Sequence, residues 1–403
     1  MGANLRRALL RLTALLVIGA AATLALAGPH VEGRDAALSM LKARSYVELD
    51  AALSDKQRSY ARGTLSELDL LDAFRVFYWS DPALEPFYDE WVGRFSNSYA
   101  ARLARGIYLK RIGMAHGGDR PARYTAPDRI ERMHAYYEKA MADFDASLKL
   151  EVKPTLSYLY MMDIKKYSRP VSIDIWLFRF DLIDAESHVL SQALKVAPES
   201  FILRRKYMHT LETRWGGSTA AMHAFLGASW VAQLTPEHFA ALEALVLQDR
   251  GWVKAQRGDK AGSMAAYKEA LARVDLNNLQ LFEYGRRELL LHEAALAHQR
   301  VREYAQALRY LDMAIDAGAS SPEIYIARGV SYHQLANMKA AVADYREAAE
   351  RGNAWAQNEV GMYYWHGIVV ERDRQEATKW FARSAEQGFP DGVKHLKWAK
   401  KLR

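Results

Sequence analysis

Side chains that could act in catalysis or metal binding are scattered along this 403-residue chain and form no known motif. The sequence has no cysteine, which excludes disulfides, thiolate nucleophiles and cysteine-ligated zinc or iron–sulfur clusters. None of the twelve histidines belongs to an H-E-x-x-H zinc helix, and His292 and His298 stand six residues apart, on different faces of a helix. Glycine-rich phosphate loops and the G-x-S-x-G nucleophile elbow are absent too. We therefore expect no cofactor, no metal site and no catalysis.

Two further patterns would suit a reaction site but have simpler structural interpretations. Carboxylate pairs such as Asp143 with Asp145 could share acid and base roles, yet on helices such pairs usually form a solvated face. The segment Arg214-Trp215-Gly216-Gly217-Ser218 could be a glycine-rich site. We interpret it as a tight turn between helices that requires a positive φ, with Trp215 packed beneath it.

Aromatic residues are abundant, with ten tryptophans and twenty-two tyrosines. The cluster that runs from Phe74 to Trp79 is expected to form the core and lid of one helix pair. A carbohydrate-binding platform would use the same kinds of ring. The sequence leaves both interpretations open, because burial cannot be read from it.

The elements that must position these side chains are paired helices. Between Pro322 and Asn353, small and aromatic residues recur on two apolar stripes separated by a short polar break. They are Gly329, Tyr332, Ala341, Tyr345 and Ala348. The small residues would let two helix backbones approach closely, and the tyrosines would fill the space between turns. This order resembles the tetratricopeptide repeat, whose 34-residue unit is a helix pair.

The unit that follows resembles a Sel-one-like repeat, a related family with a longer loop between its helices. The residues that carry this resemblance are Ala356, Gly361, Tyr364, Gly367, Asp373, Ala377, Trp380, Ala385 and Gly388. One extra residue falls in the loop Ile368–Arg372. We expect Ala348 and Ala385 to be equivalent, each at a point where two helices nearly touch.

Fainter copies of the pattern lie upstream. They comprise Ala307, Leu311 and Ala314, preceded by Leu291, Ala295 and His298, and an earlier set of Gly251, Tyr267 and Ala270. The wide spacing from Ala270 to Ala314 indicates an insertion around residues 274–288. Leu190 and Ala193, followed by Pro198, mark another second helix. We predict an all-α, right-handed superhelical solenoid of antiparallel helix pairs, with tetratricopeptide-like and Sel-one-like units from residue 244 onward.

Residues 34–230 keep a helical pattern without the alternation typical of strands, so helix pairs are expected throughout. This half resembles an uncharacterised bacterial family, a domain of unknown function that often accompanies such repeats. The resemblance rests on Asp81-Pro82, Glu90-Trp91-Val92, Ser98-Tyr99, Ala104-Arg105-Gly106 and Arg214-Trp215-Gly216-Gly217-Ser218. It implies no activity. We expect a signal peptide over 1–27, an N-terminal helical domain over 28–235 and a repeat region over 236–403 that ends in a basic helix.

Residues 1–27 have the composition of a secretory signal peptide. Arginines precede an apolar run from Leu12 to Leu26, and Ala25-Leu26-Ala27 is a small-residue cleavage site. We expect cleavage before Gly28 and a periplasmic protein. An uncleaved signal would instead leave the protein anchored in the inner membrane.

The formal net charge of +7 is concentrated at the two ends of the chain. Three arginines lie in the signal segment, and the last ten residues contain five basic residues and no acidic one. They are Lys394, Lys397, Lys400, Lys401 and Arg403. Basicity therefore does not indicate a nucleic-acid-binding face, and membrane contact is expected only through the signal segment or this basic tail.

The resemblance to tetratricopeptide repeats implies a non-catalytic protein-interaction scaffold that holds a peptide or partner protein in a concave groove. In that family the second, fifth, ninth and twelfth residues of a unit face the groove. Numbering from Ala244, Glu288, Pro322 and Ala354 places mostly polar and aromatic candidates there: Gln248, Trp252, His292, Gln299, Glu323, His333, Trp355, Asn358 and Trp365. Amides can pair with a peptide backbone, and tryptophan offers a rigid contact. Several, especially Trp252 and Trp355, could instead pack against neighbouring units.

The expected partner is an unknown protein or peptide of the cell envelope, with no nucleic acid. Two alternatives remain open at this point. One is a cell-envelope enzyme with an unrecognised site in residues 34–230. The other is a peptidoglycan or glycan-binding module that uses exposed aromatic rings.

Overall fold

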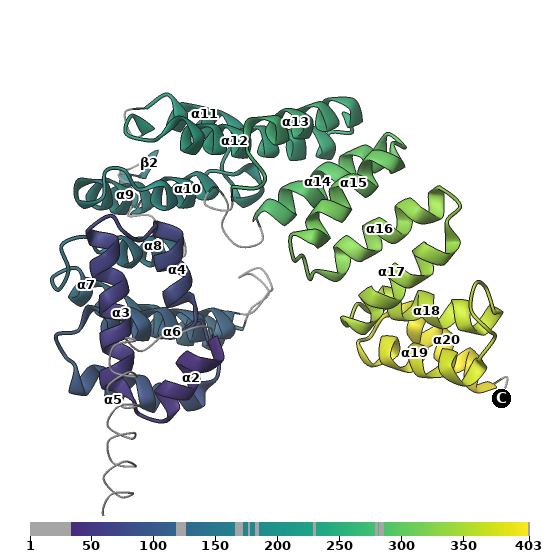
Figure 1. Ribbon diagram of the computed structural model, residues 1–403, viewed down its shortest axis with the longest axis horizontal. Coiled ribbons are helices and arrows are strands. Elements are labelled where there is room, and N and C mark those ends of the chain that lie inside the picture. The colour runs from purple at the N-terminus through teal and green to yellow at the C-terminus, as the bar shows by residue number, and fades with distance from the viewer. Residues whose placement is uncertain are drawn as a thin grey trace, which may run out of the picture. The chain divides into compact units, whose positions relative to one another are not determined.

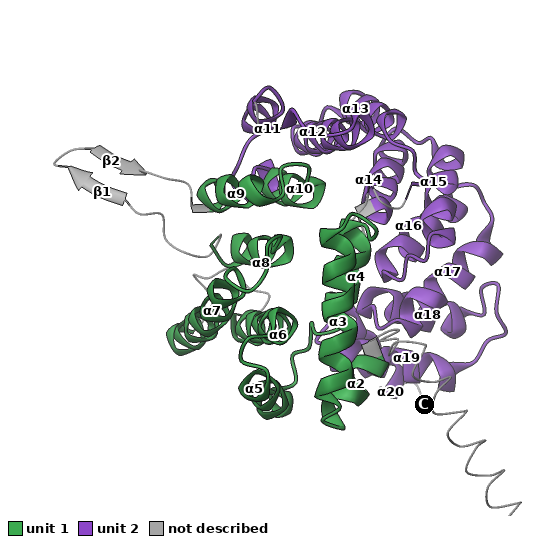
Figure 2. Ribbon diagram, turned by 60° about the vertical axis from the view of Figure 1, so that its left-hand side comes forward, with its two compact units in different colours: residues 1–210 green, residues 211–403 purple. Residues whose placement is uncertain are grey.

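The computed structural model describes residues 34–117, 126–165, 172–175, 178–181, 185–228, 231–278, 281 and 286–401, which form α-helices and one short sheet (Figure 1). The chain divides into two compact units, Met1–Thr210 and Leu211–Arg403 (Figure 2). The predicted signal segment and its cleavage site before Gly28 lie outside the described residues. Within the described part, no helix combines the length and apolarity needed to cross a membrane.

Unit 1 consists of helices joined by short turns, with a hairpin between α8 and α9. Its elements are α2 (Arg34–Lys42), α3 (Tyr46–Ala61), α4 (Glu67–Arg75), the 3-10 turn η1 (Pro82–Leu84), α5 (Glu85–Arg94), α6 (Tyr99–Gly117), α7 (Pro127–Ser147), α8 (Thr155–Lys165), β1 (Ser172–Ile175), β2 (Phe178–Asp181), α9 (Ala185–Val196) and α10 (Phe201–Thr210). The second helix marked by Leu190 and Ala193 is α9, and it ends before Pro198 as predicted.

Unit 2 is built of consecutive helix pairs. Its elements are η3 (Thr213–Trp215), α11 (Thr219–Leu226), α12 (Pro236–Gln256), α13 (Lys260–Arg273), α14 (Arg286–Arg300), α15 (Tyr304–Asp316), α16 (Pro322–Gln334), α17 (Met338–Glu350), α18 (Ala354–His366), α19 (Arg374–Glu386) and α20 (Pro390–Lys401). Each of the four predicted units is one pair, from α12 and α13 to α18 and α19, which confirms the all-α fold of antiparallel helix pairs. The predicted insertion lies between α13 and α14.

A two-stranded antiparallel sheet is the exception to the helical prediction. β1 pairs with β2, with Ser172 opposite Asp181 and Ile175 opposite Phe178. The sequences Ser-Ile-Asp-Ile and Phe-Arg-Phe-Asp do alternate apolar and polar residues, which is the strand period. The expectation that helix pairs continue through residues 34–230 was therefore wrong here, because four-residue alternations are too short to stand out against a helical background.

The division between the units also differs from the expected boundary at 235/236. Along the chain, unit 1 ends at Thr210 and unit 2 begins at Leu211. The reason is that α11 and η3 both contact α12, so the segment from 211 to 235 packs with the repeats.

The core of unit 1 is aromatic. Phe74, Phe77 and Trp91 are fully buried, and the rings of Phe77 and Trp91 lie 5.8 Å apart. The expectation that the cluster from Phe74 to Trp79 forms core is confirmed for its two phenylalanines.

Polar groups are buried here too. Asp163 accepts bonds from Lys110 and Lys206; burial alone would raise the pKa of Asp163, but these two ammonium groups outweigh it and hold that pKa far below its usual value.

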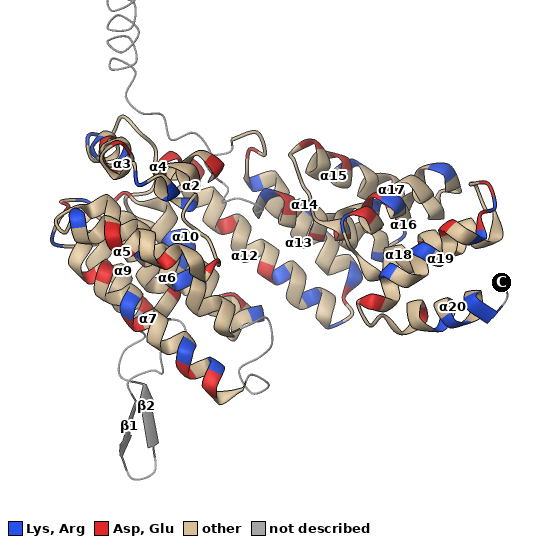
Figure 3. Cartoon of the chain, turned by 90° about the horizontal axis from the view of Figure 1, so that it is seen from below, with Lys and Arg blue, Asp and Glu red and all other residues tan. Residues whose placement is uncertain are grey.

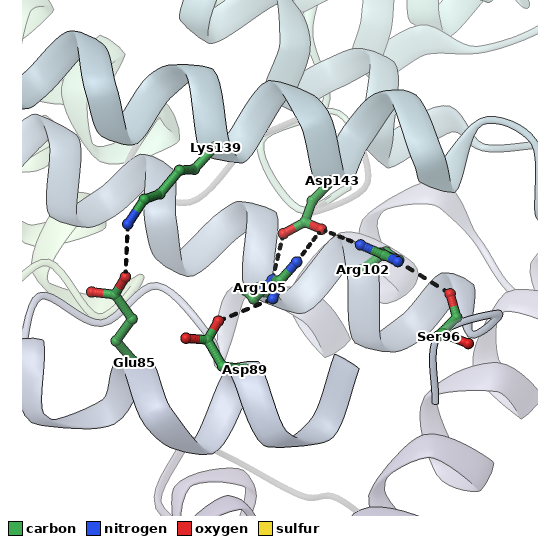
Figure 4. Close-up of polar contacts among 7 residues, drawn as sticks. All are labelled: Glu85, Asp89, Ser96, Arg102, Arg105, Lys139 and Asp143. Atoms are coloured by element: carbon green, nitrogen blue, oxygen red, sulfur yellow. Dashed lines mark hydrogen bonds and ion pairs between the residues drawn. The ribbon is translucent and has the colours of Figure 1, made fainter. Parts of the chain in front are cut away.

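Asp143 is not on a solvated face as expected. Only 1% exposed, it accepts bonds from the Arg105 Nε at 2.7 Å and the Arg102 Nη1 at 3.0 Å (Figure 4). Arg105 also donates to Asp89 at 3.0 Å, which ties α5, α6 and α7 together. Asp145, two residues on, is exposed, so the two carboxylates do not share a site. The helix period turns one of them inward and the other outward.

Helix pairs in both units are held by a repeated contact between a glycine and an aromatic ring. A Cβ added at Gly329 would lie 2.7 Å from Tyr345, and one added at Gly361 would lie 2.6 Å from Phe381. The other pairs are Gly106 with Phe144, Gly113 with Tyr137 and Gly251 with Tyr267. Because only glycine permits this approach, the prediction of close helix contact at Gly329 is confirmed.

The contact also corrects the alignment of the last repeat. Ala348 is fully buried as expected, but Ala385 is only half-buried. Ser384 is the buried residue instead, and its Oγ donates to the Ala354 carbonyl at 2.7 Å. The ring that meets glycine is Phe381 rather than Trp380, so the true register of α19 is shifted by one residue. Ala385 was assigned from sequence spacing, and the loop before α19 absorbs the difference.

The basic C-terminal segment forms α20, which packs on α19 and α18. Figure 3 shows the basic residues of α20 in blue. Ala399 is buried against the cluster around Trp365 and Phe381, whereas Lys394, Lys397 and Lys400 are exposed. α20 therefore covers the apolar end of the repeats with one face and presents charge on the other.

Candidate functional site

Within unit 2, α12 contacts α14 and α14 contacts α16, while α18 packs against α17 and α19 and also contacts α20. Figure 2 shows α14 and α16 on one side of the stack, with α15 and α17 on the other. We call the surface formed by α12, α14, α16 and α18 the first-helix face. All nine predicted binding residues belong to these four helices.

Three of the predicted residues each form a hydrogen bond to another helix of unit 2, and we call them the amide ladder: Gln248, Gln299 and Asn358. The Gln248 Nε2 donates to the Glu293 Oε2 at 2.7 Å, joining α12 to α14. The Gln299 Nε2 donates to the Ala327 carbonyl at 2.6 Å, joining α14 to α16. Asn358 Oδ1 lies 2.7 Å from the His395 Nδ1, joining α18 to α20. All three amides form hydrogen bonds to groups of this chain, and Gln248 and Asn358 are buried.

The three tryptophans are also engaged in packing. Trp365 is 4% exposed and lies between the rings of Phe381 and Trp398, at 6.4 and 4.4 Å. Trp355 is half-buried and meets the Tyr345 ring edge-on at 5.4 Å. Trp252 is half-buried, with the Arg214 guanidinium 5.6 Å from its ring. Trp365 is therefore a core residue, while Trp252 and Trp355 keep part of their rings at the surface.

The remaining candidates are the more accessible ones. Glu323 and His333 are exposed near the two ends of α16, and His292 is half-buried on α14. Burial lowers the pKa of His292 below its usual value, although the nearby carboxylates of Glu293 and Glu323 oppose this shift. The structure thus brings His292 and Glu323 together from two neighbouring first helices.

His292 also lines a pocket inside unit 2 with a volume of about 230 Å³. Leu289 and His292 contribute from α14, Ile324 from α16, and the loop from Ala317 to Ser321 closes the other wall. The lining is largely apolar, and its polar residues are Glu288, His292, Ser320 and Ser321. A pocket of this kind accepts one medium-sized side chain rather than a complete small-molecule ligand.

Sequence reasoning missed an aliphatic row along the first helices: Leu296 on α14, Ile326 and Val330 on α16, and Met362 on α18. All four are half-buried, packed at the edge of the core with part of each side chain at the surface. Leu296, Val330 and Met362 occupy the ninth position of the predicted units. The numbering of the repeat units therefore includes these residues among its groove positions. The sequence analysis selected polar and aromatic residues as binding candidates and passed over the aliphatic ones.

Two acidic residues of unit 2 were missed as well. Glu293 receives Gln248 and, at 2.9 Å, the Arg214 Nη1. Asp249 is 1% exposed and accepts bonds from the Thr213 backbone N–H and from the Thr213 and Thr219 hydroxyls, each at 2.8 Å or less. No sequence motif announces either role, because the partners lie far along the chain. Asp249 holds η3 and the start of α11 against the second half of α12, and Glu293 joins α14 to η3 and to α12.

The segment Arg214-Trp215-Gly216-Gly217-Ser218 is a turn, as interpreted. Gly216 has φ 96°, and a Cβ on Gly217 would lie 2.2 Å from the Leu211 carbonyl oxygen. Ser218 caps α11 by accepting the Ala221 N–H. The expectation that Trp215 packs beneath this turn was wrong, since its side chain is 53% exposed. The reason is that Asp249 holds the turn by hydrogen bonds, so an aromatic base is not needed.

Within the described residues, no three histidine or acidic side chains come together to hold a metal ion. The large aromatic side chains that the described residues leave exposed are Trp215 and Trp398. Arg214 is held by Glu293 and Glu212, at 2.9 and 3.2 Å. The first-helix face has an aliphatic row, a small pocket and exposed polar groups. Apolar and polar groups occur together in this way at binding interfaces.

No family model and no curated protein matches the chain. Among solved structures, it is similar to yeast Tom70 at 12% identity and a TM-score of 0.47, covering 84% of this chain but only 61% of that one.

The chain is also similar to c5321, a protective antigen of uropathogenic Escherichia coli with an SLR fold, at 14% identity and a TM-score of 0.41, over 91% of both chains. A Sel1 repeat protein from Oxalobacter formigenes matches at 15% identity and a TM-score of 0.38, over 93% of this chain and 95% of that one. None of these TM-scores reaches 0.5, and the fold is therefore assigned from the helix pairs themselves.

Proposed function

We propose that this protein is a non-catalytic scaffold, exported to the cell envelope, whose first-helix face in unit 2 binds a peptide or a partner protein. The observation that carries the proposal is the aliphatic row, in which Leu296, Val330 and Met362 recur at one position of successive first helices and stay half-buried. A repeated row of this kind offers an extended apolar surface that no single repeat could supply.

Groups beside the row would set the specificity. Glu323 and His333 are exposed on the same helix as Ile326 and Val330. The pocket at His292 offers a place for one apolar side chain of the partner, with the imidazole as a hydrogen-bonding group. Apolar contacts flanked by polar ones are the usual composition of a protein interface.

The amide ladder has a supporting role in this proposal. Gln248, Gln299 and Asn358 already form hydrogen bonds to other helices of unit 2, so they hold these helices together instead of meeting a partner. Trp365 likewise belongs to the packing around α20. We therefore move the binding role from these four predicted residues to the aliphatic row and its exposed neighbours.

Export remains part of the proposal and rests on residues 1–27. Their arginines, apolar run and Ala25-Leu26-Ala27 site support secretion with cleavage before Gly28. N-terminal sequencing of the protein from an envelope fraction tests this: Gly28 as the first residue supports a periplasmic protein, and an intact leader in washed membranes supports an anchored one.

Site-specific photocrosslinking in the producing cell tests the binding face. A photoreactive amino acid is placed at exposed positions of α16, at Glu323 or His333, and at exposed positions of the second helix α17, at Lys339 or Arg346. We expect a discrete protein or peptide adduct from the α16 positions and none from the matched α17 positions. Adducts from α17 alone would move the interaction to the second helices.

A further inference from the structure

A separate polar pocket lies entirely within unit 1. It is bounded by α3, by the connection between α5 and α6, and by the loop between α7 and α8, and its volume is about 450 Å³. Its charged and hydrogen-bonding lining includes Asp50, Gln57, Arg58, Arg94, Ser98 and Glu151. The first-helix face of unit 2 contributes no residue to it.

Gln57 is the innermost polar group of this pocket. Its side chain is 1% exposed, and its Nε2 donates to the Lys153 carbonyl at 3.1 Å. That bond fixes the orientation of the amide and leaves the Gln57 Oε1 buried without a hydrogen-bond partner. Buried acceptors are nearly always satisfied in native proteins, so this oxygen indicates a donor supplied from outside the chain.

Asp50 provides a second acceptor on the same helix. Its Oδ1 accepts the Trp91 Nε1–H at 3.2 Å and the Ser98 hydroxyl. Its Oδ2 has no hydrogen-bond partner in the part of the chain that the structure describes. Two donors thus hold the carboxylate in place while one oxygen is left for a ligand.

The wall opposite α3 is held in place by an ion-pair network. Arg102, which donates to Asp143, also donates from Nε to the Ser96 carbonyl at 3.4 Å (Figure 4). Ser98 accepts the Ala101 N–H and caps the start of α6. The connection that carries Ser96 and Ser98 is therefore fixed before any ligand arrives.

The open side of the pocket carries positive charge. Arg58 and Arg94 have side chains 60% and 58% exposed, and each is paired on its outer side with an acid of its own helix, Asp55 or Glu90. The pocket itself is lined by two acids, Asp50 and Glu151, and by these two arginines. Its charges balance, with the unpartnered acceptor of Gln57 buried, the two acids half-buried and the two arginines exposed.

From this polarity we propose that the pocket binds a small zwitterion of the amino-acid type, either a free amino acid or a dipeptide. The ligand's ammonium group would donate to the Gln57 Oε1 and the Asp50 carboxylate, and its carboxylate would accept from Arg58 and Arg94. An ammonium group has three donors and no acceptor, which matches two acceptors better than a hydroxyl does. Charge-assisted bonds of this kind are the stronger ones.

Calorimetric titration of the full chain tests the assignment. The probes are the twenty free amino acids and alanyl-alanine, followed by the N-acetylated and the C-amidated form of the best binder. We expect N-acetylation to weaken binding by about tenfold or more, because it removes the ammonium group and leaves the buried acceptors unmet. Amidation should weaken binding less, because the arginines are exposed and screened.

The same series distinguishes the two sources of this chemistry. A free amino acid that binds more tightly than alanyl-alanine assigns the pocket to single amino acids, and the reverse assigns it to short peptides. Either result supports a zwitterion site.

Three variants locate the binding. Gln57→Leu should reduce affinity by about tenfold or more, since it removes the unpartnered acceptor. Arg58→Ala, at an exposed position that is safe for folding, should weaken binding of the carboxylate form and leave the amidated form unchanged. Arg62→Ala, just beyond the end of α3 and outside the pocket, is the matched control and should bind as the unmodified chain does.

The proposal is overturned by any of three results. The first is that no probe produces heat at concentrations up to about 10 mM, a Kd that corresponds to a binding free energy weaker than about 3 kcal/mol. The second is that the N-acetylated form binds as tightly as the free amine. The third is that glucose, a neutral polyol, binds while the amino acids and the dipeptide do not.

Discussion

Replacing Gly329 by alanine tests the packing that the repeats share. The new Cβ would lie 2.7 Å from the Tyr345 ring, which is too short for a carbon contact, and 3.2 Å from the Ala341 carbonyl oxygen, which is tight. Tyr345 cannot simply turn away, because Trp355 and Tyr363 pack on it at 5.4 and 6.2 Å. Overpacking of this kind costs about 1–3 kcal/mol, against a gain of about 0.5–1 kcal/mol from replacing a helical glycine. The net loss should lie between about 0 and 2.5 kcal/mol.

A matched control separates the clash from the general effect of removing glycine. Gly227, also in unit 2, has a negative φ, and its added Cβ would come no closer than 3.7 Å to another atom. Gly227→Ala should therefore stabilise unit 2 by about 0.4–1 kcal/mol through the unfolded chain. Opposite signs for these two variants are the specific signature of the close approach at Gly329.

Native-state hydrogen exchange read by mass spectrometry is the suitable assay, because it reports the opening free energy of α16 and α17 separately from unit 1. Combining Gly329→Ala with Tyr345→Leu should recover most of the clash, so that the two changes are strongly non-additive. If Gly329→Ala stabilises α16 and α17 as much as Gly227→Ala stabilises its own region, the glycine–aromatic contact is not what joins the helices.

Four further predictions follow from other contacts. Val369 has φ 67°, so Val369→Gly should stabilise unit 2 by about 0.5–1 kcal/mol in urea unfolding. Asp143→Asn should destabilise unit 1 by about 2–3 kcal/mol, because Arg102 and Arg105 lose a buried counter-ion. Trp365→Ala should cost about 3–5 kcal/mol of unfolding free energy, as expected for a core residue. Because the pKa of His292 is lowered in the folded chain, unfolding free energy should fall as pH drops below its ordinary value of 6.5, and His292→Gln should reduce that slope.

Contacts within a helix pair could be predicted from the sequence. Gly329, Ala341 and Tyr345 are close in the chain, and their spacing predicts that two helices pack closely there. It does not predict which ring each glycine meets, since Gly361 meets Phe381 rather than Trp380. The same logic found the pair of α12 and α13 through Gly251 and Tyr267. Such contacts are local, so a periodic pattern carries nearly all the information they need.

Contacts between pairs could not be predicted in the same way. Gln248 and Asn358 stand at the position that the repeat frame assigns to a binding groove, yet their amides bond to Glu293 on α14 and His395 on α20. Whether an amide meets a partner or the next helix depends on the distance between first helices, which loop lengths set. Loop length also explains why Ala385 was predicted to be equivalent to Ala348, whereas the structure shows that the equivalent residue is Ser384. The two differ by one residue, which lies in the loop.

The pocket of unit 1 gave no signal in the sequence. Asp50, Gln57 and Ser98 belong to no motif, and their grouping depends on how α3 packs against the start of α6. Burial separates Gln57 from many other glutamines of the chain, and burial is a property of the fold.

The central claim, that the aliphatic row of the first-helix face binds the partner, is tested most directly by comparing two identical substitutions. Once photocrosslinking has identified the partner, its Kd is measured for Ile326→Ala on α16 and for Ile315→Ala on α15, both half-buried positions in unit 2. Ile326→Ala should weaken binding by about fivefold to tenfold, while Ile315→Ala should leave the Kd unchanged at a similar loss of stability. Equal effects of the two variants, or an effect of Ile315→Ala alone, would contradict the claim.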